Sequence, residues 1–461
     1  PDEWRSADAE RPRLGRKENV AIKLSDSFTY GRLALFAAPS IVMMVFASVY
    51  SVVDGLFVSN FAGKDALAAV NLVFPLVTAL GCIGYMLGTG GAALVAKIMG
   101  EGDGERANRL FTFVFLSAVA FGIALSLVGS AFMGPFLGFM GAEGGLVDLS
   151  VQYGRILFFA LPFFILQNVF QSFFVAAEKP HVGLAVIVAG GLTNIALDYA
   201  FIGVFGWGVV GAALATAAGQ ALAAIVPIVY FATSRTSRLR LAKPAFELRS
   251  LGKACVNGSS ELMTEIAASV VAMLYNFQLM GLAGADGVAA YGIIMYVNFV
   301  FTAVFFGFSM GTGPIISYNY GAGRHLELKG LLRKSLVIVG VFGIAMFGLS
   351  HFAAVPLVNL FVGYDASLAE MTLHGFRIYS VAFLLMGFSI YGSAFFTALN
   401  NGPVSALISF VRTLVLETST VMLLPIWFGI DGVWSAIIVA ESCALLLTAG
   451  LLAGFRRRYH Y

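Results

Sequence analysis

Long apolar segments separated by short polar breaks recur along the whole chain of 461 residues. A helix needs about 20 apolar residues to cross the hydrocarbon core of a bilayer, whereas a barrel strand needs only about 10 residues of alternating pattern. The segments have the length of helices, and they lie at residues 33–55, 67–97, 110–134, 152–176, 182–205, 208–232, 255–282, 289–316, 333–360, 374–398, 404–428 and 432–454. The pattern therefore predicts an all-α integral membrane protein with twelve transmembrane helices.

Composition supports a multi-pass membrane protein. Apolar residues make up 59% of the chain, charged residues only 11%, and the mean hydropathy is +0.88. A soluble domain carries about 25% charged residues. The three cysteines show no pairing or metal-binding spacing, so we interpret them as packing residues. The polar segment Pro1–Asp26 has no apolar core of the signal-peptide type, and we expect the first span to be retained.

Charged residues between the spans predict the orientation in the membrane. Basic residues fall on one side of the twelve-span arrangement: Arg5 to Lys23, Lys97 to Arg109, Lys179, Arg235 to Lys253, Arg324 to Lys334 and Arg456 to Arg458. The opposite loops carry Lys64 and mostly acids, namely Asp65, Glu143, Asp148, Asp286, Asp365, Glu370 and Asp431. By the positive-inside rule both termini are cytoplasmic. We interpret the basic stretches as topology signals near anionic lipid headgroups, not as a nucleic-acid site.

The chain contains an internal duplication. A shift of 221 positions places Gly63 on Gly284, Asp65 on Asp286, Gly90 on Gly311, Gly100 on Gly321, Gly208 on Gly429 and Gly211 on Gly432. Each copy has six spans, an even number, so the two copies run in the same direction. We expect a cytoplasmic tail (1–29), an N-lobe (30–233), a cytoplasmic connection (234–253), a C-lobe (254–455) and a C-terminal tail (456–461). Parallel repeats with a cavity between them are one plan of secondary transporters.

No motif for nucleotide-driven transport or for catalysis is present. The sequence contains no GxxxxGK[ST] phosphate-binding loop, and its five histidines form no HExxH or triad-like pattern. We therefore expect a protein that is not an enzyme, needs no cofactor and draws energy from an ion gradient.

The first candidate site residue is Asp54, which lies inside the apolar run from Leu33 to Phe61. A charge at membrane depth costs roughly 2.5–3.5 kcal/mol, so such a residue usually faces a polar cavity. Tyr50 and Ser51 lie one turn earlier and extend this polar stripe. The alternative is that Asp54 reaches the interface and only caps a helix end.

A second group of polar residues lies in the fifth and sixth spans. Asn194 and Asp198 are four residues apart and share a helix face, as do Thr216 and Gln220. Together with Asp54 they offer the oxygen ligands of a hard cation, or a proton relay. The alternative is that these groups form structural hydrogen bonds between helices.

The second half of the chain has its own buried charges. Glu261 and Glu265 lie one turn apart in the seventh span, Glu417 lies near Arg412 in the eleventh, and Glu441 takes the position of Gln220. These residues are candidates for ion coupling or substrate binding. A structural Arg–Glu pair between the last two spans is the alternative. Aromatic and methionine residues are plentiful, and we expect most of them to face lipid or to pack between helices. A few are candidates for lining a drug-sized cavity through stacking and cation–π contact, but spacing does not identify them.

Several motifs, in order, resemble the multidrug and toxic compound extrusion (MATE) family. They are VVDGLFVSNFAGKDALAAVN near the first span, GLTNIALDYAFIG, GVVGAALATAAGQ and PIISYNYGAG, and the similarity covers residues 30–455. GIDGVWSAIIVAES resembles the branch that contains MepA-type multidrug exporters. Some relatives place an acid in the tenth span, but Tyr379–Ala398 has none, which leaves Glu265 as the best coupling candidate of the C-lobe.

The resemblance implies a V-shaped antiporter that exports organic, often cationic and amphipathic compounds in exchange for Na⁺ or H⁺. It also implies that Asp54, Asn194, Asp198 and Thr216 form the cation or proton site. We expect a monomer in a bacterial cell membrane, with small organic substrates and lipids as partners. The alternative function is a flippase for lipid-linked oligosaccharides or polysaccharides, which would favour a cationic cavity and which Arg412 keeps open.

Overall fold

The computed structural model describes residues 22–139, 144–234, 236–244, 246–362 and 365–461, and these residues form helices and no strands. The expected tail (1–29) is therefore described only from Ile22 onward, and Arg5, Glu143 and Arg235 lie outside the described residues. The α-helices are α1 (Tyr30–Phe57), α2 (Lys64–Gly100), α3 (Gly104–Phe139), α4 (Gly145–Ala176), α5 (Pro180–Asp198), α6 (Gly208–Thr233), α7 (Leu248–Gly321), α8 (His325–Val362), α9 (Ala366–Tyr379), α10 (Phe383–Ala398), α11 (Gly402–Ser409) and α12 (Thr418–Tyr459).

Four short helical segments of other geometry complete the chain. A 3₁₀ turn, Ser380–Ala382, joins α9 to α10. Three π-helical segments follow α1, α5 and α11 without a break, at Val58–Ala62, Tyr199–Val204 and Phe410–Glu417. Such segments are rare and occur frequently at functional sites.

The all-helical membrane fold is confirmed, with one difference in how the spans are divided. Within the described ranges, ten continuous helical stretches are long and apolar enough to cross a membrane. Two of them, Leu248–Gly321 and Gly402–Tyr459, have 74 and 58 residues and turn back at Gly284 and Gly429, where φ is +63° and +58°. Dividing both at the turn gives twelve legs. Glycine permits this reversal without a loop because it has no Cβ.

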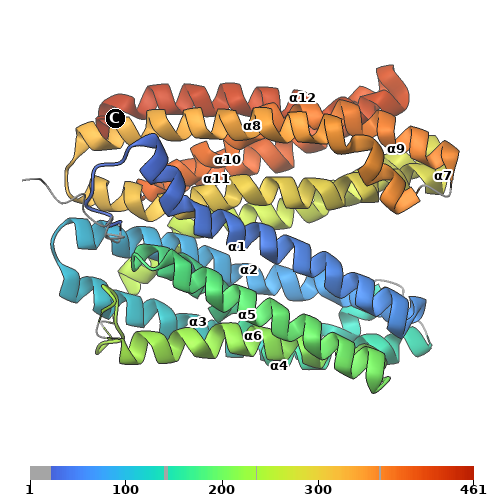
Figure 1. Cartoon of the computed structure of the whole chain (residues 1–461), viewed down its shortest axis with the longest axis horizontal. Helices are drawn as coiled ribbons and strands as arrows, with labels where there is room; N and C mark the ends of the chain where they lie inside the picture. Colours follow the sequence, from blue (N-terminus) through green and yellow to red (C-terminus); the bar gives the residue numbers. More distant parts are fainter. Residues whose placement is uncertain (1–21, 140–143, 235, 245, 363–364) are drawn as a thin grey trace, which may run out of the picture.

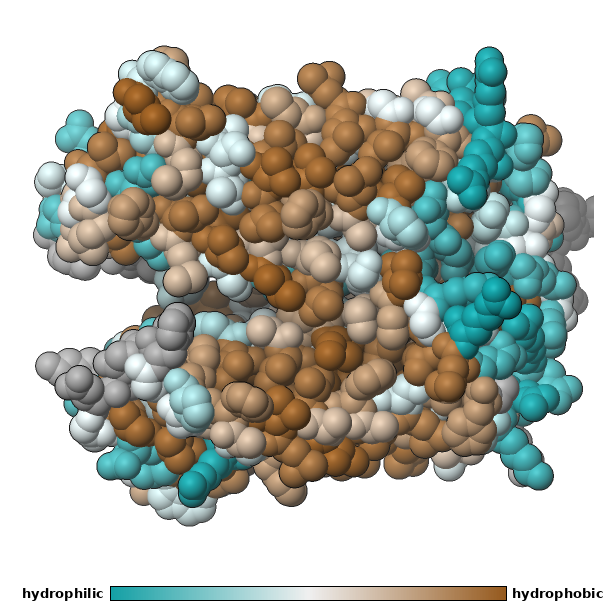
Figure 2. All heavy atoms as spheres, turned by 180° about the vertical axis from the view of Figure 1, so that it is seen from behind, coloured by the Kyte–Doolittle hydropathy of each residue, from teal (hydrophilic) through white to brown (hydrophobic). Residues whose placement is uncertain are grey.

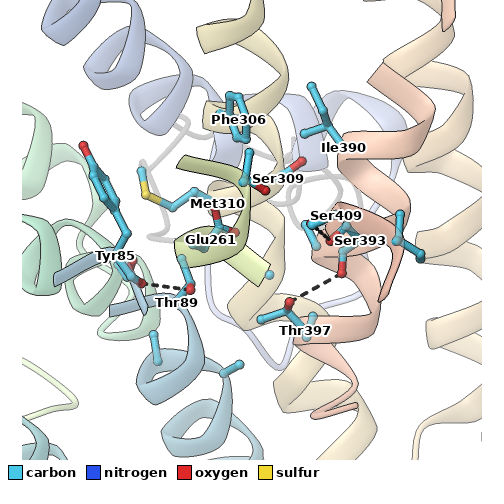
Figure 3. A pocket seen from close by; sticks show the side chains of 18 of the residues that line it. Tyr85, Thr89, Glu261, Phe306, Ser309, Met310, Ile390, Ser393, Thr397 and Ser409 are labelled. Atoms are coloured by element: carbon cyan, nitrogen blue, oxygen red, sulfur yellow. Dashed lines mark hydrogen bonds between the residues drawn. The ribbon is translucent and has the colours of Figure 1, made fainter. Parts of the chain in front are cut away.

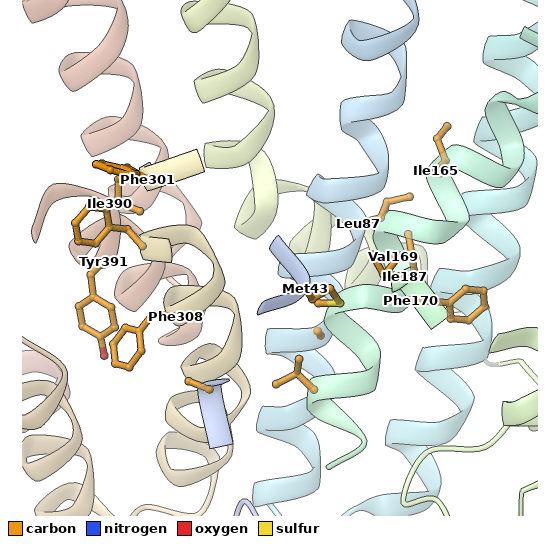
Figure 4. Packing of buried hydrophobic residues seen from close by; sticks show 14 of the residues in the cluster. Met43, Leu87, Ile165, Val169, Phe170, Ile187, Phe301, Phe308, Ile390 and Tyr391 are labelled. Atoms are coloured by element: carbon orange, nitrogen blue, oxygen red, sulfur yellow. The ribbon is translucent and has the colours of Figure 1, made fainter. Parts of the chain in front are cut away.

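The helices are arranged in two bundles. Figure 1 shows α1 to α6 in one bundle and α7 to α12 in the other, with the bundles diverging at the end away from the C-terminus. Each bundle has its own apolar interior: Met43, Leu87, Ile165 and Phe170 pack in the first, whereas Phe308 and Tyr391 pack in the second, with ring centroids 5.8 Å apart (Figure 4).

A cleft between the bundles opens at the diverging end. Figure 2 shows the hollow at this end, a broad apolar band across the visible face, and hydrophilic residues gathered at the opposite end. The band has the character expected of a surface in contact with lipid. Helices α1, α2 and α7 make the principal contacts between the bundles.

The end that carries the C-terminus is closed by close helix packing and by an extended segment. A Cβ on Gly90 of α2 would lie 2.1 Å from the carbonyl oxygen of Ala254 in α7, so only glycine permits this approach. Residues 23–29, here called the N-terminal strap, cross the same end. Leu24 donates its backbone N–H to Glu178 (2.7 Å) of the first bundle, and Phe28 donates to Glu327 (2.9 Å) of the second. The strap thus bridges the two bundles.

Candidate functional site

Close contacts of glycine bring three helices of the first bundle together. A Cβ on Gly191 of α5 would lie 2.6 Å from the Phe46 ring of α1. Gly190 of α5 and Gly219 of α6 approach each other's carbonyl oxygen, at 2.9 and 2.8 Å from the added Cβ. Small residues permit helix backbones to pack this closely in membranes. Polar side chains on α1, α5 and α6 can therefore meet.

The residues predicted for the first bundle do meet. The carboxyl groups of Asp54 and Asp198 are close enough to interact directly, and Asn194 lies beside Asp54. Asn194 Nδ2 donates to Thr216 Oγ1 across 3.4 Å. Asp198 is fully buried and Asn194 is 3% exposed. We call Asp54, Asn194, Asp198 and Thr216 the acidic cluster.

Both carboxylates of the acidic cluster lie where regular helix geometry ends. Asp198 is the last residue of α5 and directly precedes the π-helical segment Tyr199–Val204. Asp54 lies one turn before Val58–Ala62, the π-helical segment that follows α1. Wider helical turns shift the following residues relative to the helix face. The two acids thus sit at the points where α1 and α5 change geometry.

The acidic cluster has the donor chemistry of a hard cation or proton site. Among the described residues, Asp54 Oδ1, Asn194 Oδ1 and both carboxylate oxygens of Asp198 are buried and have no hydrogen-bond donor. Buried oxygens without a partner are costly, and two adjacent carboxylates repel each other. A proton or a cation with oxygen ligands, such as Na⁺, would satisfy both conditions. The described residues contain no group of three or more His, Cys, Asp or Glu side chains that could hold a metal ion.

A small cavity with several polar side chains in its wall adjoins the acidic cluster. It is lined by Tyr50, Gln167, Asn194, Thr216 and Gln220, and it has an empty volume of about 270 Å³. Tyr50 and Gln167 lie close together on α1 and α4. Asn194 and Thr216 thus border an open space that they share with other polar side chains, and they are not enclosed by apolar residues alone.

A larger cavity lies between the bundles, with an empty volume of about 900 Å³ (Figure 3). Sites for drug-sized ligands are typically apolar with a few polar groups. Its wall contains apolar and aromatic side chains together with hydroxyl groups: Met44, Tyr85, Thr89, Ser172, Phe306, Ser309, Met310, Ile390, Ser393, Thr397 and Ser409. Glu261 and Arg412 are the charged residues among those that line it in the described chain.

Of the two acids predicted on α7, one lies at this central cavity and the other lies beside it. Glu261 lines it, and Glu265 lies one turn further along the helix, where its side chain is exposed. Both carboxylates are close enough to Tyr85 of α2 to interact electrostatically. A cation in the cavity would therefore find a carboxylate, and an aromatic ring suited to cation–π contact, on facing helices.

A network of hydroxyl groups forms one side of the cavity. Ser393 Oγ lies 2.9 Å from Ser405 Oγ and 3.0 Å from Ser409 Oγ, while Thr397 Oγ1 lies 2.7 Å from Ser405 Oγ. Ser260 Oγ of α7 lies 3.3 Å from Thr397 Oγ1. This hydroxyl network connects α7, α10 and α11 in the second bundle.

The charges on the last helices form a separate cluster. Arg412 binds Glu441 through Nε (2.7 Å) and Nη2 (2.6 Å), and Glu441 is 1% exposed. Glu417 is close enough to this pair to interact electrostatically, and Tyr275 lies nearby. The structural Arg–Glu pair considered as an alternative is therefore present. Glu265 does not belong to this cluster.

Sequence reasoning did not identify the aromatic lining of the central cavity. Tyr85 and Phe306 lie 221 positions apart, as do Thr89 and Met310, and all four line the cavity. The duplication contains this signal, because equivalent positions of α2 and of the second leg of α7 face the same space. Spacing within a single helix does not reveal it.

Comparison with known proteins identifies the family. The family model described as MatE matches residues 39–200 and 262–422, which together are more than half of the chain. The chain belongs to the MatE family. Among its relatives, the multidrug export protein MepA of Staphylococcus aureus is 24% identical over 418 residues, which cover 89% of this MatE chain and 90% of that protein.

Solved structures share the fold. A MATE protein crystallised in complex with MaL6 has a TM-score of 0.89 and 21% identity, over 94% of this MatE chain and 98% of that one. The outward-facing conformation of a multidrug resistance MATE family transporter of the MOP superfamily has a TM-score of 0.88 and 22% identity, over 95% and 97% of the chains. The resemblance inferred from the sequence motifs is thus confirmed.

Proposed function

We propose that this MatE protein is a secondary active antiporter that exports organic, often cationic compounds in exchange for Na⁺ or H⁺. The observation that carries the proposal is the pair of adjacent carboxylates, Asp54 and Asp198, with buried oxygens that lack hydrogen-bond donors. Membership in a family that includes multidrug export protein MepA supports the export of drugs. The position of Glu261 on the central cavity supports a preference for cations.

Helix α1 connects the acidic cluster with the central cavity. It carries Asp54 at one level and Met44, which lines the cavity, about 15 Å away along the helix axis. It also packs against both α5 and α7. A change in charge repulsion between Asp54 and Asp198 alters the packing of α1 on α5, and α1 transmits this change to the cavity wall.

Coupling requires that the acidic cluster differ between two conformations. Na⁺ or H⁺ would supply positive charge that removes the repulsion between the carboxylates. A tenfold difference in ion affinity between the conformations corresponds to about 1.4 kcal/mol of coupling free energy. We propose that both termini are cytoplasmic, so that the cleft in Figure 2 opens to the outside and substrate leaves on that side.

The alternative function, a flippase for lipid-linked sugars, would need positive charge for a pyrophosphate group. Arg412 is the cation on the cavity wall of the described chain, and Glu441 already neutralises it through two hydrogen-bonded nitrogens. Glu261 of α7 adds negative charge to the same cavity wall. This balance favours the export of cations over the binding of a polyanion.

Ethidium efflux from proteoliposomes tests the proposal. The wild type and Asp54→Asn are compared under a Na⁺ gradient alone and a pH gradient alone, with Asp65→Asn as a control for loss of an exposed carboxylate. We expect one of the two gradients to drive efflux in the wild type and the control, and efflux to be lost in Asp54→Asn. Equal efflux by Asp54→Asn would refute the role of the acidic cluster, and no efflux under either gradient would refute cation antiport.

A further inference from the structure

A groove on the outer surface of the second bundle combines cations with an apolar floor. It lies between α8 and the last turns of α12, at the end of the molecule that carries the C-terminus (Figure 1). Lys329, Arg333 and Arg456 are the cations of its lining. Its apolar and aromatic wall consists of Leu332, Leu336, Val337, Leu452, Ala453 and Tyr461. We call this feature the headgroup groove. It shares no lining residue with the central cavity.

Two of the three cations of the headgroup groove have no partner among the residues that the structure describes. Four basic residues at this end of the protein form ion pairs with acids of the surrounding segments: Lys97 with Glu101, Arg106 with Glu247, Arg238 with Glu178 and Lys334 with Glu327. Lys329 and Arg333, in contrast, have no hydrogen bond or ion pair within the described ranges, although both are exposed. Arg456 uses Nε to bind the Tyr461 backbone oxygen (3.2 Å). The groove thus concentrates positive charge that the described residues do not neutralise.

The apolar wall extends from the cations along the bundle. Val337, Val341 and Ile344 follow Arg333 on one exposed face of α8 and are 48%, 57% and 66% exposed. On α12 the exposed residues Ala453, Ala449 and Leu446 run in the same direction away from Arg456. The small alanines leave space between the helices. Tyr461 is buried at the base, where its hydroxyl donates to the Leu452 carbonyl oxygen (2.9 Å).

We propose that the headgroup groove binds an anionic phospholipid of the leaflet at this end of the protein. The lipid phosphate lies among Lys329, Arg333 and Arg456, and an acyl chain follows Val337 and Val341 along α8. A free anion would use the cations but not the apolar wall, and a neutral lipid would use the wall but not the cations. Basic pockets between transmembrane helices are known to select anionic headgroups in this way.

Native mass spectrometry of the full chain in detergent tests this site. Phosphatidylglycerol and phosphatidylcholine with identical acyl chains are titrated against the wild type and Lys329→Gln/Arg333→Gln/Arg456→Gln. Lys243→Gln/Arg249→Gln/Lys253→Gln removes the same charge from exposed positions outside the groove. Each cation near a headgroup contributes roughly fivefold to binding, so we expect at least about a tenfold loss of phosphatidylglycerol binding in the groove variant only.

A second variant separates a binding defect from a folding defect. Ala453→Leu fills the groove at an exposed position without changing charge, and it should also weaken phosphatidylglycerol binding while the melting temperature in lipid-free detergent is kept. Equal retention of phosphatidylglycerol by the wild type and the groove variant would overturn the proposal. So would equal binding of phosphatidylcholine, or displacement of the lipid by millimolar inorganic phosphate. None of these outcomes depends on whether the protein transports a drug.

Discussion

Gly100 and Gly321 occupy equivalent positions on the two sides of one contact between α2 and α7. A Cβ on Gly100 would lie 2.1 Å from the Tyr318 carbonyl oxygen, and a Cβ on Gly321 would lie 2.1 Å from the Lys97 carbonyl oxygen. Gly100 and Gly321 are 221 positions apart, as are Lys97 and Tyr318. At the closed end of the molecule, equivalent residues of the two repeats therefore make the same glycine-to-carbonyl contact in both directions.

This reciprocal contact predicts a large effect of adding one methyl group. Gly100→Ala or Gly321→Ala forces two helix backbones apart, and overpacking of this kind costs about 1–3 kcal/mol. We expect a lower melting temperature for each variant in detergent. Gly292→Ala is the matched control, because no atom lies within 4 Å of its added Cβ. That variant should melt at the wild-type temperature or higher, since alanine favours a helix more than glycine. Equal melting of all three variants would contradict the packing argument.

Arg412 and Glu441 form a buried ion pair, so the effects of their substitutions on the free energy of unfolding should be strongly non-additive. Glu441 is 1% exposed and Arg412 only 14%, so removal of one partner leaves a buried charge. We expect Arg412→Met alone to cost about 3–5 kcal/mol, and Arg412→Met/Glu441→Leu to recover most of this loss. Thermal unfolding of the single and double variants measures the difference. If the double variant were less stable than the single one, the pair would not be the structural element that its geometry indicates.

The two acids of α7 should differ in their effect on substrate binding. Glu261 lines the central cavity, whereas Glu265 lies one turn away from it. Hydrogen bonds to charged groups contribute about 1.5–3 kcal/mol, so Glu261→Gln should raise the KM for ethidium roughly tenfold or more. Glu265→Gln is the matched comparison and should have a smaller effect. Concentration-dependent efflux measures both, and a larger effect of Glu265→Gln would place the cation further towards the open cleft.

The N-terminal strap predicts a change in accessibility at the closed end. Glu178 and Glu327 accept backbone N–H groups of Leu24 and Phe28, whose side chains are 0% and 2% exposed. Removing either carboxylate by Glu178→Ala or Glu327→Ala loses a charge-assisted hydrogen bond, which favours strap release roughly tenfold. A single cysteine at Ser25 should then react faster with a membrane-impermeant maleimide.

Asp26→Ala provides the control for the strap. Asp26 accepts from Lys23 and pairs with Arg32 (3.0 Å), and neither residue belongs to the second bundle. Loss of this carboxylate should leave the bridge between the bundles intact. Equal acceleration of labelling in Asp26→Ala would mean that any change in charge, not the bridge, controls the segment.

Much of the architecture follows from patterns that repeat over many residues. Apolar length predicts the spans, and the polar stripe through Asn194 and Asp198 predicts the helix face that meets Asp54. The turns at Gly284 and Gly429 have no loop, so their legs merge into continuous helices in the structure. The sequence also contains no local signal for the π-helical segments, because the residue types that form them also occur in the α-helices of this chain. Tertiary packing determines those details.

The hydroxyl network around Ser393 has a consequence for chemical selectivity. Each hydroxyl group of Ser393, Thr397 and Ser409 is both a donor and an acceptor, and each can rotate its hydrogen without moving a heavy atom. These three residues also line the central cavity. Reversal of the hydrogen-bond direction along the chain would offer a donor to one guest molecule and an acceptor to another. A wall of this kind accommodates compounds of opposite polarity without a change of shape.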